Sequence, residues 1–235
     1  MACVSLVCKP NDPHARAQAE LFVRRLSSLG HSVCCEPGVA LPEAVEVAFS
    51  EELVDHASHL IVLGGDGTLL YAASLMTRRV IPIVGVNLGS LGFLTPFSPE
   101  AALDRLDDAL AGRLPVVSRL RFSVVLLRDG RPGFSTVAAN DVVINHENLA
   151  RLLEITCEID AEPFFTLKAD GLIVATPMGS TATGQVGGTA SCRRRAKWWL
   201  TASRASQPPA RTESNVDPRG RSHSRGTSLP WAMLT

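Results

Sequence analysis

The sequence has no excess of charge of either sign, no apolar run long enough to span a membrane and no cysteine pair of the Cys-x-x-Cys type. Lys and Arg together number 23, as do Asp and Glu, so the overall charge does not indicate a nucleic-acid or membrane partner. Met1 is followed directly by a strand-like segment rather than by a signal peptide. We therefore expect a cytoplasmic protein whose six cysteines are reduced and mostly buried.

Two common nucleotide-binding motifs are also lacking. The glycine-rich segment at residues 60–70, Leu-Ile-Val-Leu-Gly-Gly-Asp-Gly-Thr-Leu-Leu, is neither a Walker motif nor a dinucleotide-binding fingerprint. It predicts a short buried strand, a glycine turn and a helix that Thr68 caps. Because the N–H groups at a helix start attract phosphate, Asp66 would repel a ligand there unless its carboxylate accepts a proton or holds a metal ion. The alternative is a plain strand-to-helix turn with an exposed aspartate.

The N-terminal half alternates between strand and helix patterns. We expect strands at residues 2–7, 31–36, 59–63 and 81–86, and helices at 13–29, 43–55, 68–76 and 98–111. This alternation predicts an α/β domain with a parallel sheet over residues 1–115. The loops after Leu63 and Val86 then lie at the carboxyl edge of the sheet, where such folds bind ligands.

From residue 116 to residue 182 the sequence predicts strands without helices, and therefore a partial all-β domain. Residues 154–160 alternate strictly between apolar and polar, which is typical of a half-buried strand. Residues 183–235 match neither pattern; this segment carries nine basic and two acidic residues and all three tryptophans. We interpret it as a divergent, disordered basic tail. It is either the product of a shifted reading frame or a genuine tail that binds an acidic partner.

Four motifs, taken in order, resemble the NAD kinase family. They are Gly-Gly-Asp-Gly-Thr at 64–68, Asn-Leu-Gly-Ser-Leu-Gly-Phe-Leu at 87–94, Asn-Asp-Val-Val-Ile at 140–144 and the segment 170–182, Asp-Gly-Leu-Ile-Val-Ala-Thr-Pro-Met-Gly-Ser-Thr-Ala. Diacylglycerol kinases, sphingosine kinases and phosphofructokinases have motifs related to the first one. They lack the second and fourth motifs, which therefore distinguish the NAD kinase family from them. A lipid kinase and a non-catalytic dinucleotide-binding protein stay open as alternatives.

The resemblance implies a transferase that phosphorylates the 2′-hydroxyl of the adenosine ribose of NAD, using ATP and a divalent cation such as magnesium. It implies that Asp66 is the base. The positions that the resemblance assigns to the NAD site are Asp66, Gly67, Asn140, Asp141, Arg151, Lys168, Asp170, Thr181, Ala182, Thr183, Gly184, Gln185 and Val186. It assigns the metal to no protein ligand. His56 and His59 form no complete metal-binding set.

The sequence departs from the family at several of these positions. Asp141 stands where the family usually has glutamate, Lys168 where arginine is frequent, and Thr183 where a tyrosine is expected. Family members are homo-oligomers and continue with further β-strands beyond the position of Ala182. We expect that loss of these strands leaves this chain weakly active or inactive.

Overall fold

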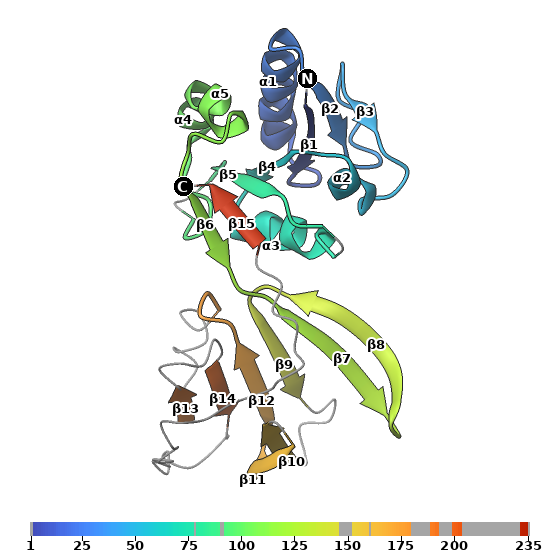
Figure 1. Cartoon of the computed structure of the whole chain (residues 1–235), viewed down its shortest axis with the longest axis vertical. Helices are drawn as coiled ribbons and strands as arrows, with labels where there is room; N and C mark the ends of the chain where they lie inside the picture. Colours follow the sequence, from blue (N-terminus) through green and yellow to red (C-terminus); the bar gives the residue numbers. More distant parts are fainter. Residues whose placement is uncertain are drawn as a thin grey trace. The chain divides into compact units, whose positions relative to one another are not determined.

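The computed structural model describes residues 2–77, 79–89, 92–145, 152–159, 161–179, 189–192, 199–203 and 231–234. The chain divides into two compact units, which we describe separately. The first unit comprises Met1–Arg119 and Pro230–Thr235, and the second comprises Leu120–Leu229. An α/β unit with a parallel sheet is thus followed by antiparallel β-strands, which confirms the predicted fold class (Figure 1).

The first unit is built around a seven-stranded sheet in the order β3-β2-β1-β4-β5-β15-β6. Its strands are β1 (Cys3–Cys8), β2 (Ser32–Cys35), β3 (Val45–Glu46), β4 (His59–Gly64), β5 (Pro82–Asn87), β6 (Val116–Arg119) and β15 (Trp231–Leu234). Strands β1 to β5 pair in parallel, as does β15 with β5, and only β6 runs antiparallel to its neighbour β15. The central strands β1, β4 and β5 are almost continuously buried, as expected for parallel strands covered on both faces.

Helices cover both faces of this sheet. They are α1 (Pro13–Ser28), α2 (Glu52–Asp55), α3 (Asp66–Leu75), α4 (Pro99–Asp104) and α5 (Leu106–Leu110). One face packs against α1, α4 and α5 in a core that includes Leu6, Phe22 and Leu106. On the other face, Ser5 Oγ donates to the carbonyl of Leu53 in α2 at 2.6 Å.

The sequence explains where α1 begins and which side it buries. Asp12 caps it by accepting from the N–H groups of His14 at 3.0 Å and Ala15 at 3.2 Å, and Pro13 occupies the first turn. The buried positions repeat every three or four residues and therefore form one apolar stripe. They are Ala15, Ala19, Phe22, Val23 and Leu26.

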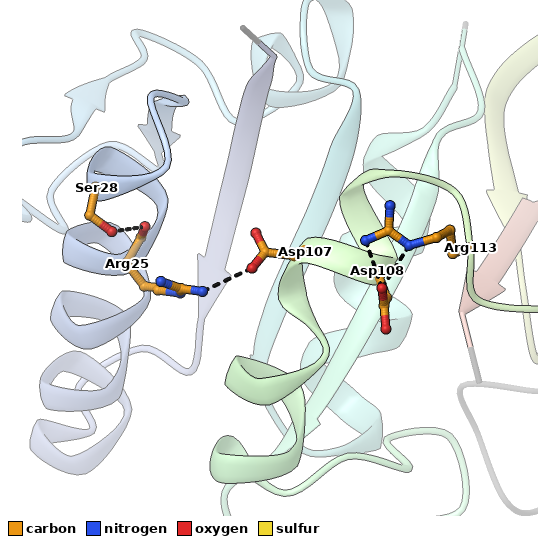
Figure 2. Close-up of polar contacts among 5 residues, drawn as sticks. All are labelled: Arg25, Ser28, Asp107, Asp108 and Arg113. Carbon is orange, nitrogen blue, oxygen red and sulfur yellow. Dashed lines mark hydrogen bonds and ion pairs between the residues drawn. The ribbon is translucent and has the colours of Figure 1, made fainter.

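Figure 2 shows exposed charged contacts beside this core. Arg25 of α1 donates through Nη2 to Asp107 Oδ2 of α5 at 2.9 Å, and Arg113 contacts Asp108 Oδ1 at 2.7 Å. Ser28 Oγ donates to the carbonyl of Arg25 at 2.7 Å near the end of α1. Because these groups are solvated, each ion pair contributes at most about 1 kcal/mol, and the apolar contact between the helices and the sheet dominates.

Two predicted helices differ from the structure. The helix expected at residues 43–55 was wrong over its first half: Val45 and Glu46 form β3 instead, pairing with Cys34 and Cys35 of β2. Glu43 has a φ of +62°, a left-handed conformation that no α-helix contains. The helix expected at residues 98–111 is interrupted at Arg105 and forms α4 and α5.

The described part of the second unit contains strands and no helix. Its strands are β7 (Phe122–Arg128), β8 (Arg131–Ala138), β9 (Asp141–Asn145), β10 (Leu153–Ile159), β11 (Glu162–Ala169), β12 (Gly171–Ala175), β13 (Thr189–Cys192) and β14 (Trp199–Ser203). They form the pairs β7-β8 and β10-β11 and a four-stranded sheet, β13-β14-β12-β9. Asp129 and Gly130 form the predicted hairpin turn, both with positive φ.

The segment at residues 183–235 contributes three strands, two to the second unit and one to the first. β13 and β14 extend the sheet of the second unit, and β15 lies between β5 and β6 of the first. The described residues of this segment therefore form strands, and the disordered tail stays a prediction. The rest of the segment lies outside the described residues.

Candidate active site

The carboxyl edge of the first sheet brings two of the predicted motifs together. β4 and β5 are parallel neighbours with Gly64 opposite Asn87, so the glycine turn after β4 and the loop after β5 begin side by side. The Leu88 N–H donates to the carbonyl of Gly64 at 3.1 Å and ties the two segments. The expectation that both loops share this edge is thereby confirmed.

Helix α3 begins earlier than predicted. Its first residue is Asp66 and its N-cap is Gly65, with no side-chain hydrogen bond to the cap, so the expectation that Thr68 caps the helix was wrong. Thr68 instead packs back against β4: a Cβ added to Gly64 would overlap Thr68 Oγ1 and lie 2.8 Å from Thr68 Cβ. The turn from β4 into α3 is consequently tight enough to require glycine at position 64.

The Asp66 carboxylate is held by the loop after β5. Oδ2 accepts from the N–H of Phe93 at 3.0 Å, and Oδ1 accepts from the N–H of Leu94 at 2.9 Å. Thr95 Oγ1 lies 3.5 Å from Oδ1 in a longer contact. Two charge-assisted hydrogen bonds thus fix the orientation of the carboxylate at the sheet edge.

The loop approaches Asp66 so closely that only glycine fits at position 92. A Cβ added to Gly92 would overlap Thr95 Oγ1 and lie 2.6 Å from Asp66 Oδ1. Gly67 is the opposite case, because a Cβ added there meets no heavy atom within 4 Å in the described part of the chain. Internal packing therefore accounts for Gly92 and leaves the space over Gly67 open at the start of α3.

The adjoining end of β2 carries an acid with an altered pKa. Tyr71 of α3 donates its hydroxyl to Glu36 Oε1 at 2.8 Å, which links the helix to the end of the strand. Burial raises the pKa of the Glu36 carboxyl above its ordinary value, although the hydroxyls of Tyr71 and Ser50 act in the opposite direction. Burial, followed by the nearby Glu36, raises the pKa of the Cys8 thiol to about 11.

The second unit holds another set of predicted residues around the start of β9. Thr176 is fully buried and its Oγ1 donates toward the carbonyls of Ala139 at 2.8 Å and Asn140 at 3.0 Å. The same hydroxyl accepts from the N–H of Gly179 at 3.2 Å, and the Thr176 N–H donates to the Asn140 carbonyl at 2.8 Å. We call these four residues, Ala139, Asn140, Thr176 and Gly179, the Asn140 node.

Glycine is again required where this node closes. A Cβ at Gly179 would overlap the Asn140 carbonyl oxygen and lie 2.9 Å from Asn140 Oδ1. Asn140 Nδ2 donates to Oδ2 of the next residue, Asp141, at 3.4 Å. Burial raises the pKa of the Asp141 carboxyl. Asn140 and Asp141 therefore lie side by side at the beginning of β9, against the small-residue segment that follows β12.

Two further predicted residues lie outside this node. Lys168 is on β11 opposite Glu154 of β10, and its Nζ lies 3.7 Å from Glu154 Oε2, with both side chains exposed. Asp170 lies between β11 and β12, immediately before Gly171. Gly171 packs against β9, because a Cβ there would lie 2.5 Å from the Ile144 carbonyl oxygen.

The remaining predicted positions lie outside the described residues. They are Arg151, Thr181, Ala182, Thr183, Gly184, Gln185 and Val186. The sequence motif at residues 87–94 carries no assigned role, and the contacts of Phe93, Leu94 and Thr95 with the Asp66 carboxylate appear only in the structure. The repeated glycines of that loop were the available signal, since a glycine is needed where backbone and side chain approach this closely.

The described residues contain no group of three or more His, Cys, Asp or Glu side chains placed to hold a metal ion. Among these residues, no helix combines the length and the apolar character needed to cross a bilayer.

Solved structures with the same fold identify the class of protein. The crystal structure of yeast NADH kinase complexed with NADH matches with a TM-score of 0.76 at 25% sequence identity, covering 98% of this chain and 66% of that chain. An NAD kinase from Archaeoglobus fulgidus in complex with ATP shares the fold with a TM-score of 0.63 at 24% identity, over 85% of this chain and 71% of that chain. The fold is that of the NAD and NADH kinases.

Sequence comparison gives the family. Residues 4–114 match the ATP-NAD kinase N-terminal domain and residues 139–184 match the ATP-NAD kinase C-terminal domain. The NAD kinase of Aromatoleum aromaticum is 39% identical over 183 residues, which cover 76% of this chain and 61% of that protein. The NAD kinase of Azoarcus sp. is 45% identical over 136 residues, which cover 58% of this chain and 46% of that protein. The chain belongs to the ATP-NAD kinase family, and these matches confirm the resemblance seen in its motifs.

The chain spans only part of the length of these relatives. The matched region covers 46% of the Azoarcus protein, 61% of the Aromatoleum protein and 64% of the NAD kinase of Geotalea daltonii, to which this chain is 39% identical.

Proposed function

We propose that this protein is an NAD kinase, which transfers the γ-phosphoryl group of ATP to the 2′-hydroxyl of the adenosine ribose of NAD and so forms NADP. One observation carries the proposal: each of the two family matches contains one of the two places where close packing requires a glycine. The N-terminal match includes the Asp66 turn, and the C-terminal match includes the Asn140 node. The NADH bound in the yeast structure supports a dinucleotide as the ligand.

In the proposed reaction, Asp66 accepts the proton of the 2′-hydroxyl. Its carboxylate is already oriented by the Phe93 and Leu94 N–H groups, so little reorganisation precedes the transfer. The phosphates bind at the N-terminus of α3, where free N–H groups and the helix dipole attract anions. The open space at Gly67 admits the nucleotide close to the backbone.

Asn140 and Asp141 bind the adenine and the ribose in this proposal. An amide offers both donors and an acceptor to a base edge, and a carboxylate accepts hydrogen bonds from ribose hydroxyls. The tight packing of Gly179 and Thr176 against Asn140 supports this role by keeping its backbone in place. Further contacts are proposed from Asp170, Lys168, Arg151 and residues 181–186, with Lys168 exchanging its exposed partner Glu154 for the ligand.

A divalent cation is required by the chemistry rather than indicated by a cluster of ligands. Because no set of metal-binding side chains gathers among the described residues, these residues do not fit a resident metal ion. We propose that magnesium enters with ATP as part of that substrate, held mainly by its phosphate oxygens.

The test is NADP formation by the purified 235-residue chain with NAD, ATP and magnesium, beside the Gly67→Ala variant. The added methyl group meets nothing in the described chain, and alanine favours a helix over glycine by about 1 kcal/mol. Gly67→Ala is therefore expected to be at least as stable as the parent in urea unfolding, yet to lose most of its activity because the methyl group occupies the nucleotide's space.

Three results would contradict the proposal. Full activity in Gly67→Ala would show that no nucleotide approaches there. Saturable NAD binding without NADP formation by the parent chain would favour a non-catalytic dinucleotide-binding protein. Phosphorylation of diacylglycerol or sphingosine in the same assay, without NADP, would favour a lipid kinase.

A further inference from the structure

The two oxygens of the Asp66 carboxylate have different surroundings. Oδ1 accepts from the Leu94 N–H and is contacted by the Thr95 hydroxyl, and both of these residues are buried, with exposures of 4% and 0%. Among the described residues, Oδ2 accepts one hydrogen bond, from the N–H of Phe93, a residue that is 74% exposed. Oδ1 therefore faces the protein interior, and Oδ2 lies on the accessible side.

We propose that residues 92–95, which we call the 92–95 loop, position the Asp66 carboxylate and make Oδ2 the oxygen that receives the substrate proton. The inference deepens the proposed function and rests on it. Each carboxylate oxygen offers two acceptor directions. Among the described residues, Leu94 and Thr95 occupy both directions at Oδ1 and Phe93 occupies one at Oδ2, so the other direction at Oδ2 is available to a ligand.

The proton balance of the transfer follows from this arrangement. The 2′-hydroxyl oxygen forms a bond to the γ-phosphorus of ATP while its proton passes to Oδ2. The bond between the γ-phosphorus and the bridging oxygen breaks, and ADP leaves with that electron pair. Throughout, the Leu94 N–H holds Oδ1, so the carboxylate does not rotate away from the hydroxyl.

The usual test of a catalytic aspartate is ambiguous at this position. In Asp66→Asn, one oxygen becomes an NH₂ group, which cannot accept a hydrogen bond. In the parent, both carboxylate oxygens accept from backbone N–H groups. In either orientation of the introduced amide, its NH₂ group would therefore face a backbone N–H, and the two donors would displace the loop. Loss of activity in Asp66→Asn would thus follow from either a lost base or a displaced loop.

Gly92→Ala separates these two effects, because it keeps the carboxylate and disturbs only its position. The new Cβ would lie 2.6 Å from Asp66 Oδ1 and overlap Thr95 Oγ1, so the loop and the carboxylate must move apart. Gly89→Ala is the matched control. Gly89 lies in the same connection, and a Cβ there meets no heavy atom within 4 Å in the described chain.

The first experiment measures steady-state NADP formation by the parent chain, Gly92→Ala and Gly89→Ala. We expect Gly92→Ala to lower kcat by about tenfold or more, with the KM values for NAD and ATP within about twofold of the parent, because orientation rather than binding is lost. Gly89→Ala should keep the parent kcat. Equal kcat values for the two variants would overturn the proposal, as would a change in Gly92→Ala confined to KM.

The second experiment does not depend on activity. Amide hydrogen exchange at Phe93 and Leu94, read by NMR on the full chain, should be slow in the parent and in Gly89→Ala. It should become fast in Gly92→Ala and in Asp66→Ala, with other amides of β4 and β5 unchanged. Unchanged exchange at Phe93 and Leu94 in Asp66→Ala would overturn the positioning role. A parent chain that shows the protection but forms no NADP would refute the proposed function and leave the loop contact standing.

Discussion

Replacement of Thr176 by valine offers the sharpest test of the Asn140 node. Valine has nearly the same shape as threonine, so the substitution removes the hydroxyl without leaving a large cavity. The hydroxyl is fully buried, donates toward the carbonyls of Ala139 and Asn140, and accepts from the Gly179 N–H. The variant therefore deprives buried backbone groups of a partner that no water molecule can easily replace.

The expected cost follows from these contacts. A buried donor or acceptor that loses its partner costs about 1 to 3 kcal/mol, and at least one carbonyl and one N–H are affected here. We expect Thr176→Val to lower the free energy of unfolding by about 2 to 4 kcal/mol. At an m-value of about 2 kcal/mol per molar urea, the midpoint should fall by about 1 to 2 M.

Thr176→Ser is the matched control, because it keeps the hydroxyl and loses one buried methyl group. That loss should cost only about 1 kcal/mol. Urea unfolding followed by far-UV circular dichroism compares the three proteins, and amide exchange at Gly179 shows whether the damage is local. If Thr176→Ser proved as destabilising as Thr176→Val, or more so, the hydroxyl would not hold the node and the reasoning would be refuted.

Two further predictions concern titratable groups of the first unit. Burial raises the pKa of the Glu36 carboxyl, so the native state binds the carboxyl proton more tightly than the unfolded chain does. The resulting stabilisation is fully present below the ordinary glutamate pKa of about 4.3 and is lost as pH rises through the raised pKa. Glu36→Gln, which can still accept from Tyr71, should therefore lose less stability than the parent between about pH 4 and pH 7 in urea unfolding; an identical loss in both proteins would contradict this. The Cys8 thiol, with a pKa of about 11, should be almost unreactive toward iodoacetamide at about pH 8 until the protein unfolds, as peptide mass spectrometry would show; rapid labelling of the folded chain would count against its burial.

The parallel sheet of the first unit could be predicted because its signals are local. Residues 60–63 form a continuous apolar run bounded by turn signals, which is the pattern of a strand covered on both faces. Asp12 and Pro13 marked the start of α1 in the same way, through a cap and a residue suited to the first turn. Each of these features depends on neighbours within a few residues.

The prediction failed where a distant partner decided the local structure. Val45 and Glu46 lie in a region of helical composition, yet they add to the edge of β2 because its backbone groups are available there. Residues 231–234, in a segment with no clear periodicity, likewise form a strand between β5 and β6. Pairing with an existing strand supplies backbone hydrogen bonds that intrinsic propensity does not reveal.

The candidate site divides along the same line. The sequence by itself determined the glycine turn, the presence of Asp66 and the order of the four motifs, because these are properties of short segments read against a known family. Only the tertiary structure decided three contacts. The N–H groups of Phe93 and Leu94 donate to Asp66, the Thr176 hydroxyl donates to the Asn140 carbonyl, and Lys168 pairs with Glu154. Each of these contacts joins residues from different chain segments, and each exists because strand pairing within its own unit brings those segments together.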